Sequence, residues 1–375
     1  MKSTNDHFGI WFLQFGILES LLLPKTENMR FALATLIVFF LFSCQEKTEI
    51  EINTVEITPV FIDSLSIRAI QPLDENRVWF AADKGKVGLI DGDTPKLAII
   101  KYGDSLLHFR SIATTKEAVF VLSIANPAVL YKIGFNGNEA TNIEEVYTEK
   151  GENVFYDSMK FWNENEGIAI GDPVENCMSV IITRDGGNTW KKLPCENLPK
   201  VEKGEAAFAA SNSNIAIFGD NAWVATGGRK SRVMHTADNG NTWEVFDTPI
   251  VQGKAMTGIY SIDFWDEKHG IIFGGNWEDK PFKEGNKAIT KNGGKTWKLI
   301  ANGKEPGYRS SVKYIPGTEG QGIVAIGSPG ISFSGDGGKN WKELSKEGFF
   351  AIEFVNDSLA FASGNNRISK LLFRR

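Results

Sequence analysis

The octapeptide TRDGGNTW at residues 183–190 occurs four times along this chain with small changes. All four copies keep the pattern Ser/Thr-x-Asp/Asn-x-Gly-x-Thr/Asn-Trp, and their tryptophans, at 190, 243, 297 and 341, lie 53, 54 and 44 residues apart. That interval is typical of one four-stranded blade of a β-propeller. The repeat therefore predicts an all-β fold built from blades. The other copies are TADNGNTW at 236–243, TKNGGKTW at 290–297 and SGDGGKNW at 334–341.

Strand-like segments recur around these copies, and each is followed by a second apolar run that ends near a glycine. Apolar alternation without a helical period predicts β-structure beyond the N-terminal region. Seven segment starts predict a seven-bladed propeller over residues 51–375. The starts are SIRAI (66–70), FRSIA (109–113), YDSMKF (156–161), EAAFAA (205–210), YSIDFW (260–265), RSSVKY (309–314) and FFAIEF (349–354).

The last blade is one strand short, because the chain ends soon after ISKLLF (368–373). The segment EINTVEITPVFI (51–62) has no blade of its own to join. Pairing it as the outer strand of the seventh blade would close the ring and remove two exposed sheet edges. We therefore expect closure by the N-terminal strand.

The repeated turn itself is expected to be structural. Its Asp or Asn side chain can accept N–H groups of its own turn, its glycine permits positive φ, and its tryptophan can pack between blades. The alternative is catalytic use of the carboxylates, but an active site is rarely repeated fourfold in one chain. The turn resembles the BNR or Asp-box hairpin of sialidases and other propellers, and it has decayed in the first two blades. The turn residues are Asp185, Trp190, Asp238, Trp243, Asn292, Trp297, Asp336 and Trp341.

The N-terminal region has the layout of a secretion signal. MRFALATLIVFFLFSC (29–44) has a basic start, a short apolar run and a small residue before Cys44. This end resembles a bacterial lipobox, which implies lipidation of Cys44 and a tether at 44–50. Gln45 follows in place of a retention aspartate, so we expect an anchored envelope protein of the outer membrane. Residues 1–28 are interpreted as lying upstream of the true start.

Composition excludes several functions. The net charge of −5 gives no basic footprint for nucleic acid. Four scattered histidines predict no metal site. No dinucleotide fingerprint, haem Cys-x-x-Cys-His motif or flavin signature is present, so we expect no cofactor. We also expect a monomer.

The blade starts should converge on one face, opposite the repeated turns. The positions taken as equivalent carry three guanidiniums, two carboxylates and a phenol, which makes this face the candidate site. They are Arg68, Arg110, Asp157, Glu205, Tyr260, Arg309 and Phe350.

Three functions fit that set. A sialidase-like glycoside hydrolase would clamp a carboxylate with the arginines, pair Tyr260 with Glu205 as the nucleophile and use Asp157 as acid/base. A binding module would hold an envelope protein, a carbohydrate or an anionic ligand with the same charges. A structural network would pair the charges with one another. FRSI at 109–112 lacks the proline of the sialidase Phe/Tyr-Arg-Ile-Pro motif, which counts against the hydrolase. We therefore favour the binding module.

A broader resemblance covers residues of about 50–375. The strand-one arginine, the glycine-ended second strand and the repeated turn recur together in propellers similar to the photosystem II stability and assembly factor. That resemblance implies a protein-binding propeller with an arginine patch, carried here by Arg68, Arg110 and Arg309. Two departures are the lost turns of the first blades and the acids that interrupt the arginines.

The remaining cysteines, Cys177 and Cys195, are centred on the turn at 183–190. Cross-strand neighbours lie close enough for a disulfide after modest adjustment, and an envelope location would be oxidising. Two free thiols are the alternative. With Cys177 expected at the start of the third strand of that blade and Cys195 at the end of its fourth, a bond across one hairpin stays open beside the two free thiols.

Overall fold

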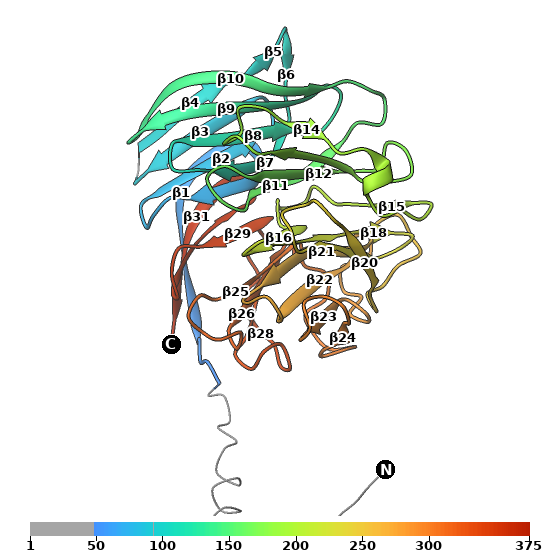
Figure 1. Cartoon of the computed structure of the whole chain (residues 1–375). Helices are drawn as coiled ribbons and strands as arrows, with labels where there is room; N and C mark the ends of the chain where they lie inside the picture. The colour runs from blue at the N-terminus through green and yellow to red at the C-terminus, as the bar shows by residue number, and fades with distance from the viewer. Residues whose placement is uncertain (1–48, 93) are drawn as a thin grey trace, which may run out of the picture. The chain divides into compact units, whose positions relative to one another are not determined.

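Apolar runs between glycine- and asparagine-rich turns fold into antiparallel strands, which confirms the all-β prediction (Figure 1). The computed structural model describes residues 49–92 and 94–375. The predicted upstream segment, signal and lipidation site Cys44 lie outside these residues. The one helical segment in the described part is the 3-10 turn η1 (Cys195–Asn197), and no helix there is long and apolar enough to span a membrane.

Four sheets contain four strands each, and burial falls from the first strands to the last. The inner strands are almost fully buried, because apolar residues follow one another in them, whereas the fourth strands are largely exposed. The sheets are β7 (Phe109–Thr114), β8 (Ala118–Ser123), β9 (Ala128–Asn136) and β10 (Glu139–Glu149); β11 (Tyr156–Phe161), β12 (Gly167–Gly171), β13 (Ser179–Thr183) and β14 (Lys191–Lys192); β16 (Ile215–Phe218), β17 (Asn221–Ala225), β19 (Arg232–Thr236) and β20 (Glu244–Asp247); and β25 (Ser311–Tyr314), β26 (Ile323–Gly327), β27 (Gly330–Ser334) and β28 (Lys342–Ser345).

Two larger sheets and a small hairpin complete the described strands. One sheet runs in the order β15 (Glu205–Ala206), β18 (Gly227–Gly228), β21 (Thr257–Phe264), β22 (Gly270–Asn276), β23 (Lys287–Thr290) and β24 (Lys298–Leu299). The other runs in the order β29 (Ala351–Phe354), β30 (Leu359–Ser363), β31 (Asn365–Arg374), β1 (Thr54–Pro72), β2 (Arg77–Ala82), β3 (Lys86–Asp91) and β4 (Thr94–Ile99). The hairpin is β5 (Lys101–Tyr102) and β6 (Ser105–Leu106).

The long strand β1 belongs to two four-stranded groups. Its first half pairs with β31, from Thr54 opposite Arg374 to Ile62 opposite Arg367. Its second half pairs with β2, from Ile67 opposite Ala82. The pairing expected for residues 51–62 is therefore present, and it joins the two ends of the described chain in one sheet.

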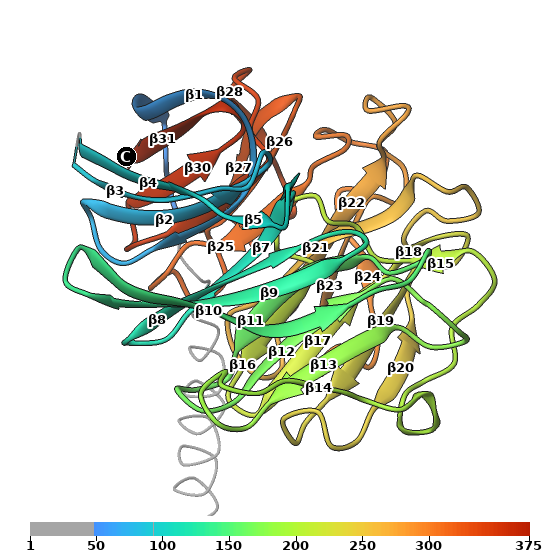
Figure 2. The same ribbon diagram turned by 90° about the horizontal axis from the view of Figure 1, so that it is seen from above.

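The first strands lie side by side around a common centre. Each contacts the next in the order β1, β7, β11, β16, β21, β25 and β29, and β29 contacts β1 (Figure 2). The core lies between neighbouring sheets, as shown by the Trp223 ring of β17, which stacks on Phe264 of β21 with 3.6 Å between ring centroids. Such stacking removes large apolar surfaces from water and fixes the sheets against one another.

The repeated turns make closely similar hydrogen bonds. Asp185 Oδ1 accepts the Thr189 N–H and the Thr183 hydroxyl, both at 2.9 Å, and Oδ2 accepts the Thr189 hydroxyl at 2.7 Å. Although burial raises the pKa of Asp185, these bonds lower it below its usual value. Gly187 has φ of 76°, and a Cβ there would lie 2.2 Å from the Phe120 ring. Trp190 is buried and packs edge-on against Phe161.

One strand assignment made from the sequence is wrong. Residues 205–210 were expected to start the fourth blade, but β16 (Ile215–Phe218) is the strand that pairs with β17. Only Glu205 and Ala206 form a short strand, β15, and this pairs with β18. The eight residues that follow, 207–214, have no regular structure and become central to the site.

Cys177 and Cys195 form a disulfide, with 5.5 Å between their Cα atoms. Cys195 lies in η1 rather than in a fourth strand, and Cys177 forms an isolated bridge with Lys200. The disulfide therefore ties the segment after the repeated turn to the start of the third strand.

Candidate functional site

The predicted site residues were chosen as equivalent positions of the first strands, and the strand registers test that choice. Arg68, Arg110, Asp157 and Tyr260 each fall at a register shift, where one residue of the first strand is left without a partner in the second. A β-bulge of this kind redirects a side chain out of the regular alternation. These four residues therefore hold one structural position in four different sheets.

Arg309 does not share that position. It lies opposite Gly327, and its N–H donates to the Gly274 carbonyl, so the bulge position belongs to Ser310. The Arg309 side chain is 4% exposed and donates to the Tyr308 carbonyl and the Ser332 hydroxyl, both at 2.8 Å. Burial, only partly offset by Glu305, lowers its pKa to about 10. The sequence analysis therefore placed this position one residue too early, at Arg309 and not at Ser310.

Glu205 is also misplaced in the sequence prediction. Its carboxylate lies in a buried ion pair with Arg232 at 2.6 Å and accepts the Thr226 hydroxyl and the Glu202 N–H. Glu205 therefore holds β15 against the neighbouring strands. The position equivalent to Asp157 is Ser213 instead, because Ile215 pairs with Val224 in the same way as Met159 pairs with Ala169.

The segment 207–214, called the crossing segment below, fills the space between the first strands. All its residues are buried except Phe208, which is half-buried. Its polar groups bond to residues of five different sheets, so the chain itself occupies the space on which the blade starts converge. The bonds run from Arg68 Nη1 to Ala210 O (3.1 Å), Arg110 Nη1 to Ala209 O (3.3 Å), Met159 N to Asn212 Oδ1 (3.0 Å), Asn212 Nδ2 to Ile112 O (2.8 Å), Ser211 Oγ to Ser310 O (2.7 Å) and Ser213 Oγ to Ser261 Oγ (2.8 Å).

Arg68 and Arg110 lie side by side at the edge of this segment, because they bind successive carbonyl oxygens. Arg68 also lies over the Phe350 ring, 4.0 Å from its centroid. Burial and the Arg68 charge lower the pKa of Arg110 to about 10, which leaves its guanidinium charged at neutral pH, and burial also lowers the pKa of Arg68. Among residues 49–92 and 94–375, neither arginine forms an ion pair, and their Nη2 atoms have no acceptor.

His108 lies beside Arg110 and is neutral at physiological pH. Its Nε2 accepts a hydrogen bond from Arg110 Nε at 3.2 Å. Burial and the Arg110 charge lower the pKa of His108 to about 4. The imidazole therefore positions Arg110 without adding charge.

Two carboxyl groups lie beyond Arg110. Asp157 is fully buried, and neither of its oxygens accepts a hydrogen bond of good geometry, although the Ala209 N–H and Arg110 act to lower its pKa. The effects of burial and of the Asp172 charge are larger than these two, and they raise the pKa of Asp157 well above the ordinary range. Burial raises the pKa of Asp172 to about 6, against the hydrogen bond that its Oδ1 accepts from Ala207 N at 2.8 Å.

The arrangement needed for a sialidase-like reaction is not assembled. The Tyr260 hydroxyl donates to the Met256 carbonyl at 3.1 Å, and its ring stacks on Phe208 with 4.1 Å between centroids. Glu205 is held by Arg232, and Arg309 is buried between sheets. The nucleophile pair and the arginine triad of that hypothesis are therefore absent from the described residues.

A second charge cluster, on the first strands, was missed by the sequence analysis. Glu353 lies between Lys313, at 2.9 Å, and Lys160, at 3.7 Å, and Asp263 Oδ2 accepts the Tyr314 N–H. Although burial raises the pKa of Glu353, the two lysines lower it. Each charge has an opposite charge nearby, so this cluster fits a structural network. Its signal was a charged residue three positions after Asp157, Tyr260, Ser310 and Phe350, a spacing that the first strands with Arg68 and Arg110 lack.

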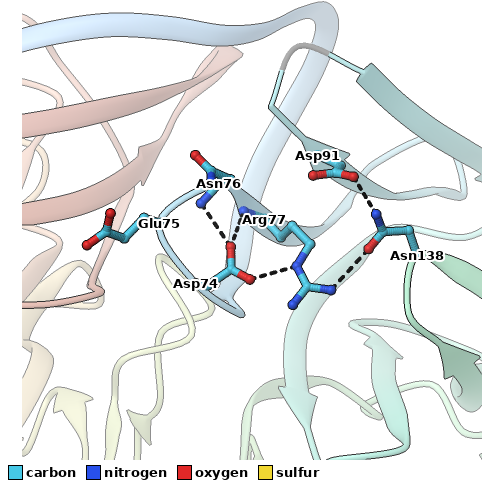
Figure 3. Close-up of a pocket in the computed structure, with 6 residues that line it drawn as sticks. All are labelled: Asp74, Glu75, Asn76, Arg77, Asp91 and Asn138. Carbon is cyan, nitrogen blue, oxygen red and sulfur yellow. Dashed lines mark hydrogen bonds and ion pairs between the residues drawn. The ribbon is translucent and has the colours of Figure 1, made fainter.

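The face that carries the repeated turns holds another polar group, at the two sheets that lack such a turn. Figure 3 shows Asn138 between Arg77 and Asp91: Arg77 Nη1 donates to Asn138 Oδ1 at 3.0 Å, and Asn138 Nδ2 donates to Asp91. Asp74 accepts the Asn76 and Arg77 N–H groups, and Arg77 Nε at 2.7 Å. These contacts tie the β9–β10 hairpin to the neighbouring sheet where no repeated turn does so.

These features define the protein as an all-β protein of the propeller type. No protein-family model matches the chain, and no curated sequence is similar to it. The fold is similar to the solved structure of YCF48 bound to D1 peptide (TM-score 0.63, 12% identity, 87% of this chain and 97% of that chain). It is also similar to YCF48 from Cyanidioschyzon merolae (TM-score 0.57, 16% identity, 86% and 98%). The WD40 beta propeller domain of Doa1 is a third match (TM-score 0.57, 11% identity, 86% and 97%). Identities this low establish the fold alone.

Proposed function

We propose that this chain is a seven-bladed Asp-box propeller closed by its N-terminal strand, which binds an acidic segment of a protein partner, or another anionic ligand, through Arg68 and Arg110. The circular order of contacts among seven first strands supports the blade count, and the pairing of β1 with β31 supports the closure. A role like that of an assembly factor is supported by the likeness to YCF48, whose solved complex holds a D1 peptide.

One observation carries the binding proposal: two adjacent, half-buried guanidiniums keep donors without an acceptor and form no ion pair among the described residues, and the charges of Asp157 and Asp83 act on Arg110 only from beyond ion-pair distance. Partial burial weakens water's competition for these charges, and hydrogen bonds from a guanidinium to a carboxylate are stronger than neutral ones. The crossing segment holds one nitrogen of each group in place. An incoming carboxylate therefore meets donors that are already oriented, which lowers the entropy cost of binding.

Fluorescence polarisation with fluorescein-labelled hexaglutamate tests this proposal. We expect binding at low salt that weakens at least about tenfold in Arg68→Ala/Arg110→Ala, because a hydrogen bond to a charged group contributes about 1.5–3 kcal/mol. Arg184→Ala is the matched control, since Arg184 lies at a repeated turn and bonds Glu166. No binding by the unaltered protein, or equal loss in the control, would count against the arginine face.

The same proposal places the protein in a bacterial cell envelope, anchored to the outer membrane by lipid on Cys44. It rests on the signal-like sequence at 29–44 alone. Cys44→Ser should release the protein from the membrane fraction or leave an uncleaved precursor, as seen by fractionation and intact mass. Unchanged membrane association with unchanged mass would remove the anchor from the account.

A further inference from the structure

The outer edge of β10 differs from the outer edges of the sheets that carry repeated turns. β10 is the terminal strand of its sheet and has eleven residues, whereas β14, β20, β24 and β28 have two to four. Short outer strands are a common protection of sheet edges against pairing with other chains. Within the described residues β10 lacks that protection, and its outward backbone groups have no strand partner.

Over the first seven residues of β10, the side chains on both faces of the strand are exposed. Residues 139–145 are all exposed, and Ile143 at their centre is 47% exposed. Register shifts fall after Ala140 and after Glu145, which leaves a regular stretch from Asn142 to Glu145. A straight, two-sided stretch of this kind is a template on which another strand can add.

The charge of this stretch selects the kind of strand that fits. β10 contains four glutamates and no lysine or arginine. Glu139 pairs with Lys96 and Glu149 with Lys192, whereas Glu144 and Glu145 form no ion pair among the described residues; Lys132 lies opposite Glu144 in β9 but donates elsewhere. Asn142 and Glu144 also line a groove of about 980 Å³, in which Lys116 is the exposed cation and Lys132 is held by the Gly186 carbonyl.

We propose that β10 is a docking edge for an extended protein segment in which lysine or arginine alternates with apolar residues. The segment adds as a strand beside Asn142–Glu145, with a cation opposite Glu144 on one face of the sheet and an apolar side chain opposite Ile143 on the other face. This surface belongs to the outer edge of its sheet, whereas Arg68 and Arg110 lie at the starts of the first strands. The proposal therefore does not depend on the arginine face.

Polarisation of a fluorescein-labelled (Lys-Val)4 peptide with the full chain tests it. We expect binding that weakens about tenfold or more in Glu144→Lys/Glu145→Lys, because each reversal replaces an exposed attraction by a repulsion. Glu175→Lys/Glu202→Lys makes the same charge change at exposed positions away from β10 and should bind nearly as well as the unaltered protein. Glu144→Gln/Glu145→Gln serves if the reversal disturbs folding, with a smaller loss.

Hydrogen exchange and a second peptide separate strand addition from attraction of charge alone. Binding should protect the amides of residues 142–145, and a (Lys-Pro)4 peptide of equal charge should bind far more weakly, because proline cannot donate to a strand ladder. Equal affinity for the two peptides, equal loss in the control variant, protection elsewhere, or no binding would each overturn the proposal.

Discussion

Asn292 shows how little charge the repeated turn requires. Its Oδ1 accepts the Thr290 hydroxyl and the Thr296 N–H, both at 3.0 Å, as Asp185 Oδ1 accepts the corresponding groups in its own turn. The geometry of one acceptor oxygen, rather than a carboxylate as such, therefore stabilises the turn. The sequence pattern predicted these bonds correctly, because donors and acceptor lie within eight residues of one another.

This comparison gives a prediction for Asp185. Asp185→Ala should lower the free energy of unfolding by about 1–3 kcal/mol, because turn donors lose their acceptor. Asp185→Asn should cost less, since it reproduces the native arrangement of Asn292. Urea unfolding of the two variants checks the order; equal costs would show that the charge of Asp185 matters more than its geometry.

Asp172 gives a pH prediction at the same scale. Its folded pKa of about 6 lies above the ordinary aspartate value of 3.8, so the folded protein holds a proton that the unfolded chain has released between these values. Stability from this group is full below about pH 4 and falls as the pH rises to about 6, by about 3 kcal/mol. In Asp172→Asn the fall in stability between pH 4 and pH 7, measured by urea unfolding, should be smaller by about that amount, while the fall that comes from Asp157 remains. An unchanged pH dependence would show that Asp172 titrates normally.

The crossing segment is the element that the sequence could not reveal. EAAFAA resembles a strand by its apolar alternation, but alternation cannot tell a regular strand from a buried irregular segment whose polar groups bond to distant sheets. The error at Arg309 has a related cause, because a bulge shifts the alignment by one residue without changing composition. In β7 and β11 the bulge falls at the position that the sequence analysis assumed, and both strands begin at their predicted first residues.

Asn212 tests the importance of the crossing segment. It has φ of 57° and bonds Met159 N and Ile112 O from two different sheets. Asn212→Ala should lower the free energy of unfolding by about 2–4 kcal/mol, since two buried backbone groups lose partners and the left-handed backbone is strained.

Asn366→Ala is the matched control for that strain. Asn366 has φ of 64°, is exposed and should cost only about 1 kcal/mol. Urea unfolding of both variants measures the difference. Equal losses would mean that the bonds of Asn212 to the neighbouring sheets add little to stability.

In the whole molecule, we separate a frame from the proposed binding face. The repeated turns and the Asn138 contacts hold neighbouring sheets together at one side, whereas Arg68 and Arg110 keep unpaired donors at the other. The repeat period predicted the frame, because repeated local chemistry is visible in sequence. The face was predicted only in part: two arginines hold the expected position, whereas Glu205 and Arg309 are committed to contacts far along the chain.

The most direct test of this division is to measure hexaglutamate affinity and urea stability together in Arg110→Ala and Asp185→Ala. We expect Arg110→Ala to lose most of its affinity while its free energy of unfolding stays within about 1 kcal/mol of the unaltered protein, because the change removes only two long hydrogen bonds, of 3.3 Å to the Ala209 carbonyl and 3.2 Å to His108 Nε2. Asp185→Ala should lose stability and bind normally in its folded fraction. Loss of binding in both variants without unfolding would contradict the division between frame and face.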